Sequence, residues 1–466
     1  MALAQPQVAI LGGGLTGLSA AFHLARRNPH VHVTVYEKTP RFGGWVRSER
    51  VEINLLDIRD QVLITAKSSP AVRARFLSLP GSNGLSMLPS SLWSLFTTRL
   101  GLLILSSVIM EVIWPANRPA GITDESVDSF FTRRFGSAFA KILGSSLVHG
   151  IYAADSRTLS VCAAFPSLWA AEERGAGSVV WGEIGPRAWW SASRRAKEAR
   201  EKEDTECWEL GTDAAFQKRL KSAALLSFTD GMETLIKALV SALDALPNVS
   251  LKPESDVTSL SHDGHALSAP PHLLANPAQT VAVLNFVFPT ARLRRPLHQP
   301  GFGYLIPRPA TGYTALSPAT SPGLLGIVFD TTSLAEQDRA LLPVPPESAR
   351  AFTPPFVKLT AMVGGPYGIP DALDERELTD GVLGRMSTQL GGVNFPRPVF
   401  TRLHVNKDAI PTFHVGHLER MGEMRDVCEK EWEGRLKVVG AGVGGPSVGD
   451  CLRAGREAAR ELVFDV

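Results

Sequence analysis

The stretch VAILGGGLTG at residues 8–17 decides the fold of this chain. Its four leading apolar residues predict a short, buried parallel strand, and glycines follow at the G-x-G-x-x-G positions 12, 14 and 17. Apolar residues then recur at helical spacing from 18 to 25, and two arginines close that helix at its negative end. A second strand over 31–36 ends at Glu37, which completes a βαβ unit.

This order of strand, glycines, helix, strand and acid is typical of a dinucleotide site. Gly12 permits the tight turn, Gly14 lets a pyrophosphate approach the backbone, and Gly17 lets helix and strand pack closely. Glu37 follows 20 residues after Gly17, where a carboxylate accepts hydrogen bonds from ribose hydroxyls, which argues against NADP. The continuation RFGGW (41–45) resembles the extension found in flavoprotein amine oxidases, and it favours FAD over NAD.

A second glycine-rich turn lies near the C-terminal end. LKVV (436–439) predicts another buried strand, and GAGVGG (440–445) leads into a helix through Arg460 that closes over the flavin in FAD enzymes of this kind. The turn also contains GPSVG (445–449), which matches the nucleophile elbow of α/β-hydrolases. Those enzymes need a histidine downstream of the serine, and no histidine follows Ser447, so the hydrolase interpretation fails.

Composition excludes several other classes. The chain has 466 residues, 44% of them hydrophobic and 20% charged, as expected of a folded globular protein with two or three domains. A net charge of +2 gives no reason to expect nucleic acid as a partner. The four cysteines form no Cys-x-x-Cys pair, so we expect reduced thiols. His414 and His417 are three residues apart, but nothing nearby completes a metal site, and we expect none.

One apolar stretch stands apart from this ordinary composition. LGLLILSSVIMEVIW (100–114) is shorter than the roughly 20 residues that span a bilayer. Two interpretations remain open: a buried core helix, or a helix that enters one leaflet without crossing it. The first seven residues contain no apolar signal core, so we do not expect secretion.

Segments spread over most of the chain resemble the protoporphyrinogen oxidases in their eukaryotic, fungal form, which belong to the flavin monoamine oxidase-like superfamily. The matching segments are DESVDSFFTRRFG (124–136), HGIYAADSRTLSVCAAFPSLW (149–169), GMETL (231–235), QPGFGYLIPRP (299–309), LLGIVFD (324–330), AIPTFHVGH (409–417) and VGDC (448–451).

The resemblance implies an α/β and α+β fold with three interleaved parts. A Rossmann-like FAD-binding domain would be assembled from 1–69, 213–270 and 406–466. A helical membrane-binding domain would occupy 70–212, and a sheet-rich substrate-binding domain 271–405. The family binds the mitochondrial inner membrane from the intermembrane-space side without spanning it. The resemblance also suggests two protein partners: a second copy of the chain, in a homodimer, and ferrochelatase.

The implied reaction, in haem biosynthesis, oxidises protoporphyrinogen IX to protoporphyrin IX with dioxygen and releases hydrogen peroxide. The flavin carries the chemistry, so we name no catalytic side chain. The implied FAD contacts are Gly12, Gly13, Gly14, Leu15, Thr16, Gly17, Glu37, Lys38, Trp45, Val257, Pro446, Ser447 and Val448. The implied substrate contacts are Arg75 (to a propionate), Phe302, Gly303, Leu305, Val328 and Met362. Ordinary strand packing is the alternative for Val328 and Met362, and an exposed structural arginine for Arg75.

The sequence departs from the family at two junctions. After Arg50 the family continues into a phenylalanine-rich strand and a Gly-Pro-Arg segment that line the flavin, and both are missing here. A strand and a helix are largely absent near HALSAP (265–270). Three hypotheses therefore remain: a porphyrinogen-oxidising flavoenzyme, another flavoenzyme of the amine-oxidase type, and a catalytically impaired isoform or mis-spliced gene model that retains the fold.

Overall fold

A computed structural model describes most of the chain as two compact units. It describes residues 5–46, 62–66, 69, 74–114, 117–185, 223–262, 265–266, 276–290, 293, 296–335, 356–462 and 464. One unit contains 1–63, 227–278 and 409–466, and the other contains 64–226 and 279–408. The expected division of the chain into three parts stays a prediction.

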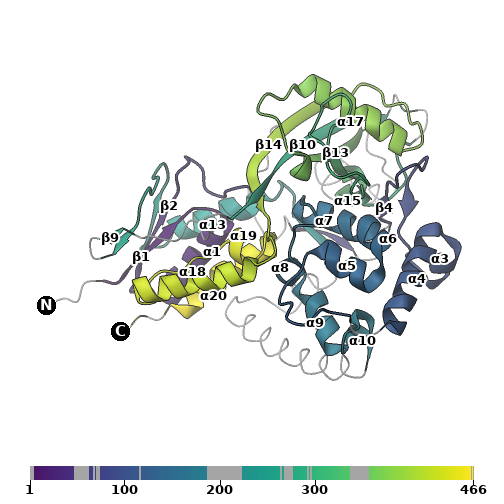
Figure 1. The fold of residues 1–466 in the computed structure, drawn as a ribbon. Coiled ribbons are helices and arrows are strands. Elements are labelled where there is room, and N and C mark those ends of the chain that lie inside the picture. Colours follow the sequence, from purple (N-terminus) through teal and green to yellow (C-terminus); the bar gives the residue numbers. More distant parts are fainter. Residues whose placement is uncertain are drawn as a thin grey trace. The chain divides into compact units, whose positions relative to one another are not determined.

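The first unit is built on the predicted βαβ motif (Figure 1). Three parallel strands form its sheet in the order β1-β2-β7, and Val33 and Val35 of β2 are fully buried. The apolar stripe predicted for the first helix is buried, from Leu18 to Ala25, against this sheet. The elements are β1 (Gln7–Leu11), α1 (Leu15–Arg27), β2 (His32–Tyr36), α13 (Glu233–Asp244), β7 (Val249–Lys252), α18 (His417–Trp432), α19 (Ala441–Gly444) and α20 (Val448–Glu461).

The predicted C-terminal helix packs directly on the first one. Gly455 of α20 lies so close to α1 that a Cβ there would meet the Thr16 carbonyl oxygen at 2.4 Å. The Ser19 hydroxyl donates to the Leu452 carbonyl at 2.9 Å. The strand predicted just before this helix is wrong. Residues 436–439 join no sheet, and Val438 and Val439 are 40% and 41% exposed, because an apolar run forms a strand only where a neighbouring strand pairs with it.

The second unit contains a seven-stranded sheet in the order β14-β10-β13-β12-β11-β4-β5. Its long central strands, β10 and β13, pair antiparallel from Val281 opposite Gly364 to Pro289 opposite Phe356. The strands are β4 (Phe76–Leu77), β5 (Ser86–Met87), β10 (Ala278–Pro289), β11 (Gly303–Leu305), β12 (Leu324–Val328), β13 (Phe356–Gly364) and β14 (Phe400–Pro411). Smaller elements of this unit are α15 (Asp330–Ser333) and a 3-10 turn (Gly365–Tyr367). Two further strand pairs are β3 (Val62–Ala66) with β6 (Ala223–Phe228) and, in the first unit, β8 (Ser261–His262) with β9 (His265–Ala266).

The two faces of this sheet differ in burial. One face carries Leu284, Phe286 and Phe288, which form a core with one side of helix α17 (Glu375–Gln389) (Figure 1). Because side chains alternate along a strand, Asn285 and its neighbours two residues away lie on the opposite face. The side chains of β10 and β13 on that opposite face are half-buried or exposed, except that of Val281, which is buried. We call it the open face.

The described residues between 92 and 184 of the second unit are mostly helical. Helix α4 covers the apolar stretch noted above and packs against α3, α5 and α10. The helices are α3 (Leu92–Thr97), α4 (Arg99–Ile113), α5 (Val127–Phe135), α6 (Ser137–Phe139), a π-helical turn (Ala140–Gly144), α7 (Ser145–Tyr152), α8 (Val161–Ala164), α9 (Pro166–Arg174) and α10 (Val179–Ile184). Among the residues described, no helix has the length and apolar character needed to cross a bilayer.

Helix α4 is not a buried core helix. Leu102 is 51% exposed and Ile113 66% exposed, whereas Glu111 is fully buried. The Glu111 carboxylate binds the Arg134 guanidinium at 2.5 Å and accepts hydrogen bonds from the Ser178 hydroxyl (2.8 Å) and the Val179 amide (2.6 Å). A buried carboxylate needs such partners, so the charged side of α4 is held inward and its apolar side faces outward.

Candidate functional site

The glycine loop of the first unit has the shape of a phosphate cradle. Gly12 adopts φ +102, and a Cβ on Gly17 would lie 2.0 Å from the Gly12 carbonyl oxygen, so both positions need glycine. A Cβ on Gly14 would meet nothing within 4 Å. Gly14 is also the N-cap of α1, and no side chain caps that helix end. The first-turn amides and the positive end of the helix therefore face open space, which suits a pyrophosphate.

Glu37 lies beside this loop as a buried, ionised acceptor. One carboxylate oxygen accepts from the Gly13 amide (2.9 Å), and the other from the Thr39 amide (2.9 Å) and hydroxyl (2.8 Å). Burial alone would raise the pKa of Glu37, but the hydrogen bonds from Thr39 and Gly13 outweigh it and lower that pKa. The neighbouring Lys38 is exposed, while Leu15 and Thr16 are buried in the first turn of α1.

The RFGGW segment (41–45) folds back onto the glycine loop. The Gly43 amide donates to the Gly13 carbonyl at 2.7 Å. The Arg41 guanidinium holds the turn by donating to the carbonyl groups of Gly44 (2.5 Å) and Val46 (3.0 Å). Trp45 is 57% exposed at the end of this turn, so its indole is accessible to a ligand.

The remaining predicted FAD contacts come from later parts of the same unit. The Ser255 amide donates to the Glu37 carbonyl at 2.8 Å, so the chain passes Glu37 two residues before Val257, which is 40% exposed. Pro446 precedes Ser447, the N-cap of α20, whose hydroxyl accepts from the Asp450 amide at 3.1 Å, and Val448 begins the helix. Ser447 therefore acts as a helix cap, as its place in the glycine turn suggests.

Most predicted substrate contacts lie together on the open face. Gly303 pairs directly with Val328, Leu305 with Gly326, and Gly326 with Met362. Residues paired across neighbouring strands share a face, so Gly303, Leu305, Val328 and Met362 are all on this side. Met362 is 36% exposed and Val328 half-buried, so neither is ordinary core packing.

Arg75 and Phe302 meet at the edge of this group. The Arg75 guanidinium lies 5.8 Å from the centre of the Phe302 ring. The backbone fixes the ring's position, because the Phe302 amide donates to the Ala74 carbonyl and its carbonyl accepts from the Phe329 amide, both at 2.9 Å. Arg75 is exposed, and its charge is available to a carboxylate ligand at this edge.

Helix α7 covers one end of the open face. A Cβ on Gly150 would lie 2.9 Å from a Leu305 methyl group. His149 fixes this contact, with Nδ1 2.7 Å from the Ile306 carbonyl and Nε2 2.7 Å from the Tyr313 hydroxyl. Burial lowers the pKa of His149 to about 4, so the ring is neutral, with Nδ1 donating and Nε2 accepting.

Sequence reasoning missed one polar group on the open face. The Asn285 amide donates to the Thr360 hydroxyl at 2.8 Å, and that hydroxyl donates to the Asp330 carboxylate at 2.6 Å. Asp330 lies beyond β12, at the start of α15, so strand alternation does not give the direction of its side chain. The signal was present for Thr360, which lies two residues before Met362 in β13. Side chains two apart in a strand point the same way.

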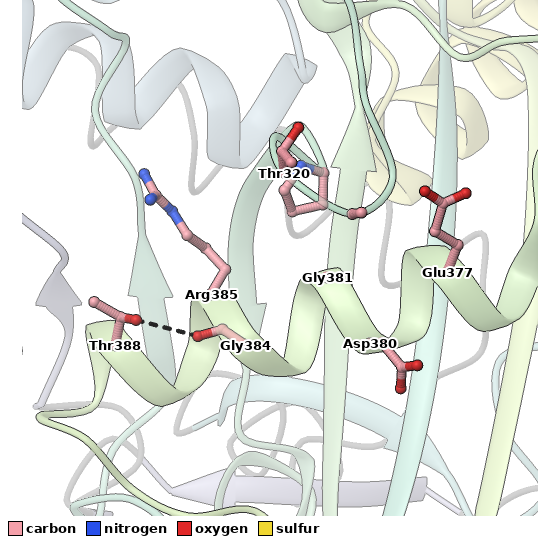
Figure 2. A pocket seen from close by; sticks show the side chains of 9 residues that line it. Thr320, Glu377, Asp380, Gly381, Gly384, Arg385 and Thr388 are labelled. Atoms are coloured by element: carbon pink, nitrogen blue, oxygen red, sulfur yellow. Dashed lines mark hydrogen bonds between the residues drawn. The ribbon is translucent and has the colours of Figure 1, made fainter.

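A cleft of about 490 Å³ lies elsewhere, between α17 and the turn at 317–322 (Figure 2). In Figure 2 Arg385 and Glu377 extend from the helix on either side of the Thr320 turn, and Asp380 points away from it. The core side of α17 packs on the face opposite the open one, and none of the predicted substrate contacts lines this cleft.

The described residues contain no cluster of three or more potential metal ligands among His, Cys, Asp and Glu. The junctions after Arg50 and near Pro270 lie outside the described residues.

Comparison with known proteins extends these observations. Residues 10–78 match the NAD(P)-binding Rossmann-like domain. Protoporphyrinogen oxidase of Schizosaccharomyces pombe is 27% identical, with 98% of each chain covered. That alignment runs over 532 positions, more than the 466 residues here, so the relative has segments with no counterpart in this chain.

Solved structures agree on the fold. A protein from an Exiguobacterium strain, provisionally named protoporphyrinogen oxidase, superposes with a TM-score of 0.66 at 18% identity, with 98% of each chain covered. A putrescine oxidase variant superposes with a TM-score of 0.55 at 14% identity, again covering 98% of each chain. The predicted Rossmann-like α/β fold and the resemblance to protoporphyrinogen oxidases are therefore confirmed.

Proposed function

We propose that this chain is an FAD-dependent oxidase that converts protoporphyrinogen IX to protoporphyrin IX in haem biosynthesis. The observation that carries the proposal is the similarity to a protoporphyrinogen oxidase over 98% of both chains. The reaction removes six electrons and six protons from the substrate in three steps. Each step reduces one dioxygen to one hydrogen peroxide, so atoms and electrons balance.

The first unit holds the cofactor. Amides at the start of α1 bind the pyrophosphate beside Gly14, where a side chain would otherwise stand. Glu37 accepts hydrogen bonds from the ribose hydroxyls, since its lowered pKa keeps it ionised at neutral pH. When bound, the isoalloxazine supplies the two-electron oxidation and is reoxidised by dioxygen.

The open face of the second unit holds the macrocycle. Its half-buried side chains Leu305 and Val328 and its exposed Met362 offer apolar contact to a broad ring, and Phe302 extends that surface. Arg75 binds a propionate, because a guanidinium pairs well with a carboxylate. These residues bind and orient the substrate and transfer no proton, so no general base is assigned.

The exposed apolar side of α3, α4 and α10 binds a membrane surface without crossing it. Trp93, Leu102, Ile113, Trp114 and Ile184 are each more than half exposed there. Exposed apolar side chains on helices that pack together favour an apolar partner, and amphipathic helices use such side chains to enter one leaflet. We propose that this surface binds the mitochondrial inner membrane from the intermembrane-space side. Candidate protein partners are a second copy of the chain and ferrochelatase.

The proposal is tested on the full chain purified in detergent. A flavin absorbance spectrum after incubation with FAD, and a gain of porphyrin fluorescence from protoporphyrinogen IX above the rate without protein, are the expected results. A chain that binds FAD but oxidises only an amine such as putrescine would support the amine-oxidase alternative, in line with the second structural likeness. A colourless chain that takes up no FAD would contradict the proposal and favour a catalytically impaired isoform.

A further inference from the structure

Three polar side chains cross the open face in one row. Asn285 lies on β10, Thr360 lies opposite it on β13, and Asp330 is the first residue of α15, two residues after the end of β12. Asn285 Nδ2 lies 2.8 Å from Thr360 Oγ1, which lies 2.6 Å from Asp330 Oδ2. All three are half-buried. We call them the acceptor row. The other side chains of β10 and β13 on this face are mostly aliphatic, apart from Gln279, Phe356 and Lys358.

The hydrogens of the row all point toward Asp330. The Asn285 amide is the donor to Thr360, so the single hydroxyl hydrogen of Thr360 is left for Asp330. Such a chain polarises each bond in the same sense and fixes the rotamer of the carboxylate. An ionised carboxylate has roughly four acceptor positions, so Asp330 can accept from several donors at once.

The row lies among the proposed substrate contacts. Thr360 pairs with Val328, which pairs with Gly303, and Met362 is two residues further along β13. A macrocycle lying on these residues would extend over several strands, since neighbouring strands are about 5 Å apart. We place its inner edge over the acceptor row, which lies among these contacts. The chemistry of that inner edge therefore decides what Asp330 can do.

Substrate and product differ at that inner edge. A porphyrinogen carries four pyrrole N–H donors and no acceptor nitrogen, whereas a porphyrin carries two N–H groups and two nitrogen lone pairs. A carboxylate attracts the first arrangement and repels the lone pairs of the second.

We propose that Asp330, positioned by Thr360 and Asn285, accepts hydrogen bonds from the pyrrole N–H groups and selects porphyrinogen over porphyrin. This inference rests on the proposed function and adds to it a residue that distinguishes substrate from product. As a consequence, Asp330 binds the substrate through its four N–H groups and binds the product more weakly, because two of those four nitrogens then carry lone pairs.

The test compares substrate and product affinity in Asp330→Asn. The asparagine keeps an oxygen for the Thr360 hydroxyl but loses the charge. We expect the KM for protoporphyrinogen IX to rise about tenfold or more, since a hydrogen bond to a charged group carries that weight. The inhibition constant of protoporphyrin IX should change less than about twofold or tighten, because its lone pairs no longer face a charge. Asp371→Asn, an exposed acid in the same unit, is the matched control and should change neither constant.

A second pair of variants separates positioning from folding. Thr360→Val removes the hydroxyl at nearly the same volume and should raise KM in the same direction, and Thr360→Ser should restore it. The KM values of the two variants are compared only if both unfold at the same midpoint as the wild type. If Asp330→Asn does not fold, these two variants test whether the row acts on substrate binding.

Two results would overturn the inference while leaving the proposed function intact. One is a folded Asp330→Asn enzyme with unchanged KM. The other is a parallel loss of substrate and product affinity, which would mean that Asp330 only supports the shape of the face. If the wild-type chain neither binds nor oxidises any porphyrinogen, the proposed function fails and this inference fails with it.

Discussion

Gly14 and Gly17 lie three residues apart in one loop, but a methyl group added at each would meet different surroundings. At Gly17 the added carbon would lie 2.0 Å from the Gly12 carbonyl oxygen and 3.3 Å from an Ile10 methyl group. At Gly14 it would meet no protein atom within 4 Å. Gly17→Ala therefore perturbs the fold, whereas Gly14→Ala perturbs the space that we assign to the pyrophosphate.

The expected magnitudes differ accordingly. Overpacking typically costs about 1–3 kcal/mol, and alanine regains about 1 kcal/mol of helix propensity, so Gly17→Ala should lose up to about 2 kcal/mol of unfolding free energy. Gly14 has φ −70, which alanine adopts freely, and alanine at the N-cap costs less than about 1 kcal/mol. Displacing the pyrophosphate from the helix amides should weaken FAD binding by about 2 kcal/mol, or roughly 30-fold.

Two measurements on each variant test this reasoning. Denaturant unfolding of the FAD-free chain gives stability, and titration with FAD followed by flavin fluorescence gives affinity. Gly14→Ala should bind FAD weakly at nearly normal stability, and Gly17→Ala should be less stable. Wild-type FAD affinity in Gly14→Ala would refute the assignment of the cradle.

Three further predictions concern the second unit. Glu111→Gln should lower the free energy of unfolding by about 3–5 kcal/mol, because it leaves Arg134 charged and buried; an unfolding curve like that of the wild type would contradict this. His149, whose pKa falls from 6.5 to about 4 on folding, takes up its proton first in the unfolded chain, so stability should fall by about 3 kcal/mol as pH drops from 6.5 to 4. His149→Gln should flatten that pH dependence in thermal melts, and an unchanged slope would assign it to another group. Ile113→Ser with Leu102→Ser should reduce flotation with cardiolipin-containing liposomes at an unchanged melting temperature, and equal flotation would exclude α4 as the membrane contact.

The sequence predicted those parts of the fold that depend on local rules. The glycine loop, α1 and α20 follow from residues close together in the chain, since a tight turn and a helix start need only their own neighbours. The prediction of a strand at 436–439 was wrong, because a strand needs a pairing partner from a distant part of the chain, and the local sequence does not specify that partner.

The direction in which side chains point was harder to predict. The run from 100 to 114 left a core helix and a surface helix equally open, and the buried contacts of Glu111 decided between them. Those contacts join residues 23, 67 and 68 positions apart in sequence, so no local pattern reveals them. The acceptor row was within reach only in part. The spacing of two from Thr360 to Met362 in β13 places these side chains on one face, whereas Asp330 begins α15, and only its hydrogen bond with Thr360 places it there.

The central claim is that this chain, with its shortened junctions, still oxidises protoporphyrinogen IX through FAD. The most direct measurement follows protoporphyrin fluorescence and hydrogen peroxide together in air, with FAD-loaded chain, and subtracts the spontaneous oxidation seen without protein. We expect protoporphyrin to form at a rate proportional to the FAD-loaded chain, with three peroxides for each porphyrin. FAD-loaded chain that forms porphyrin no faster than the protein-free control would contradict the claim.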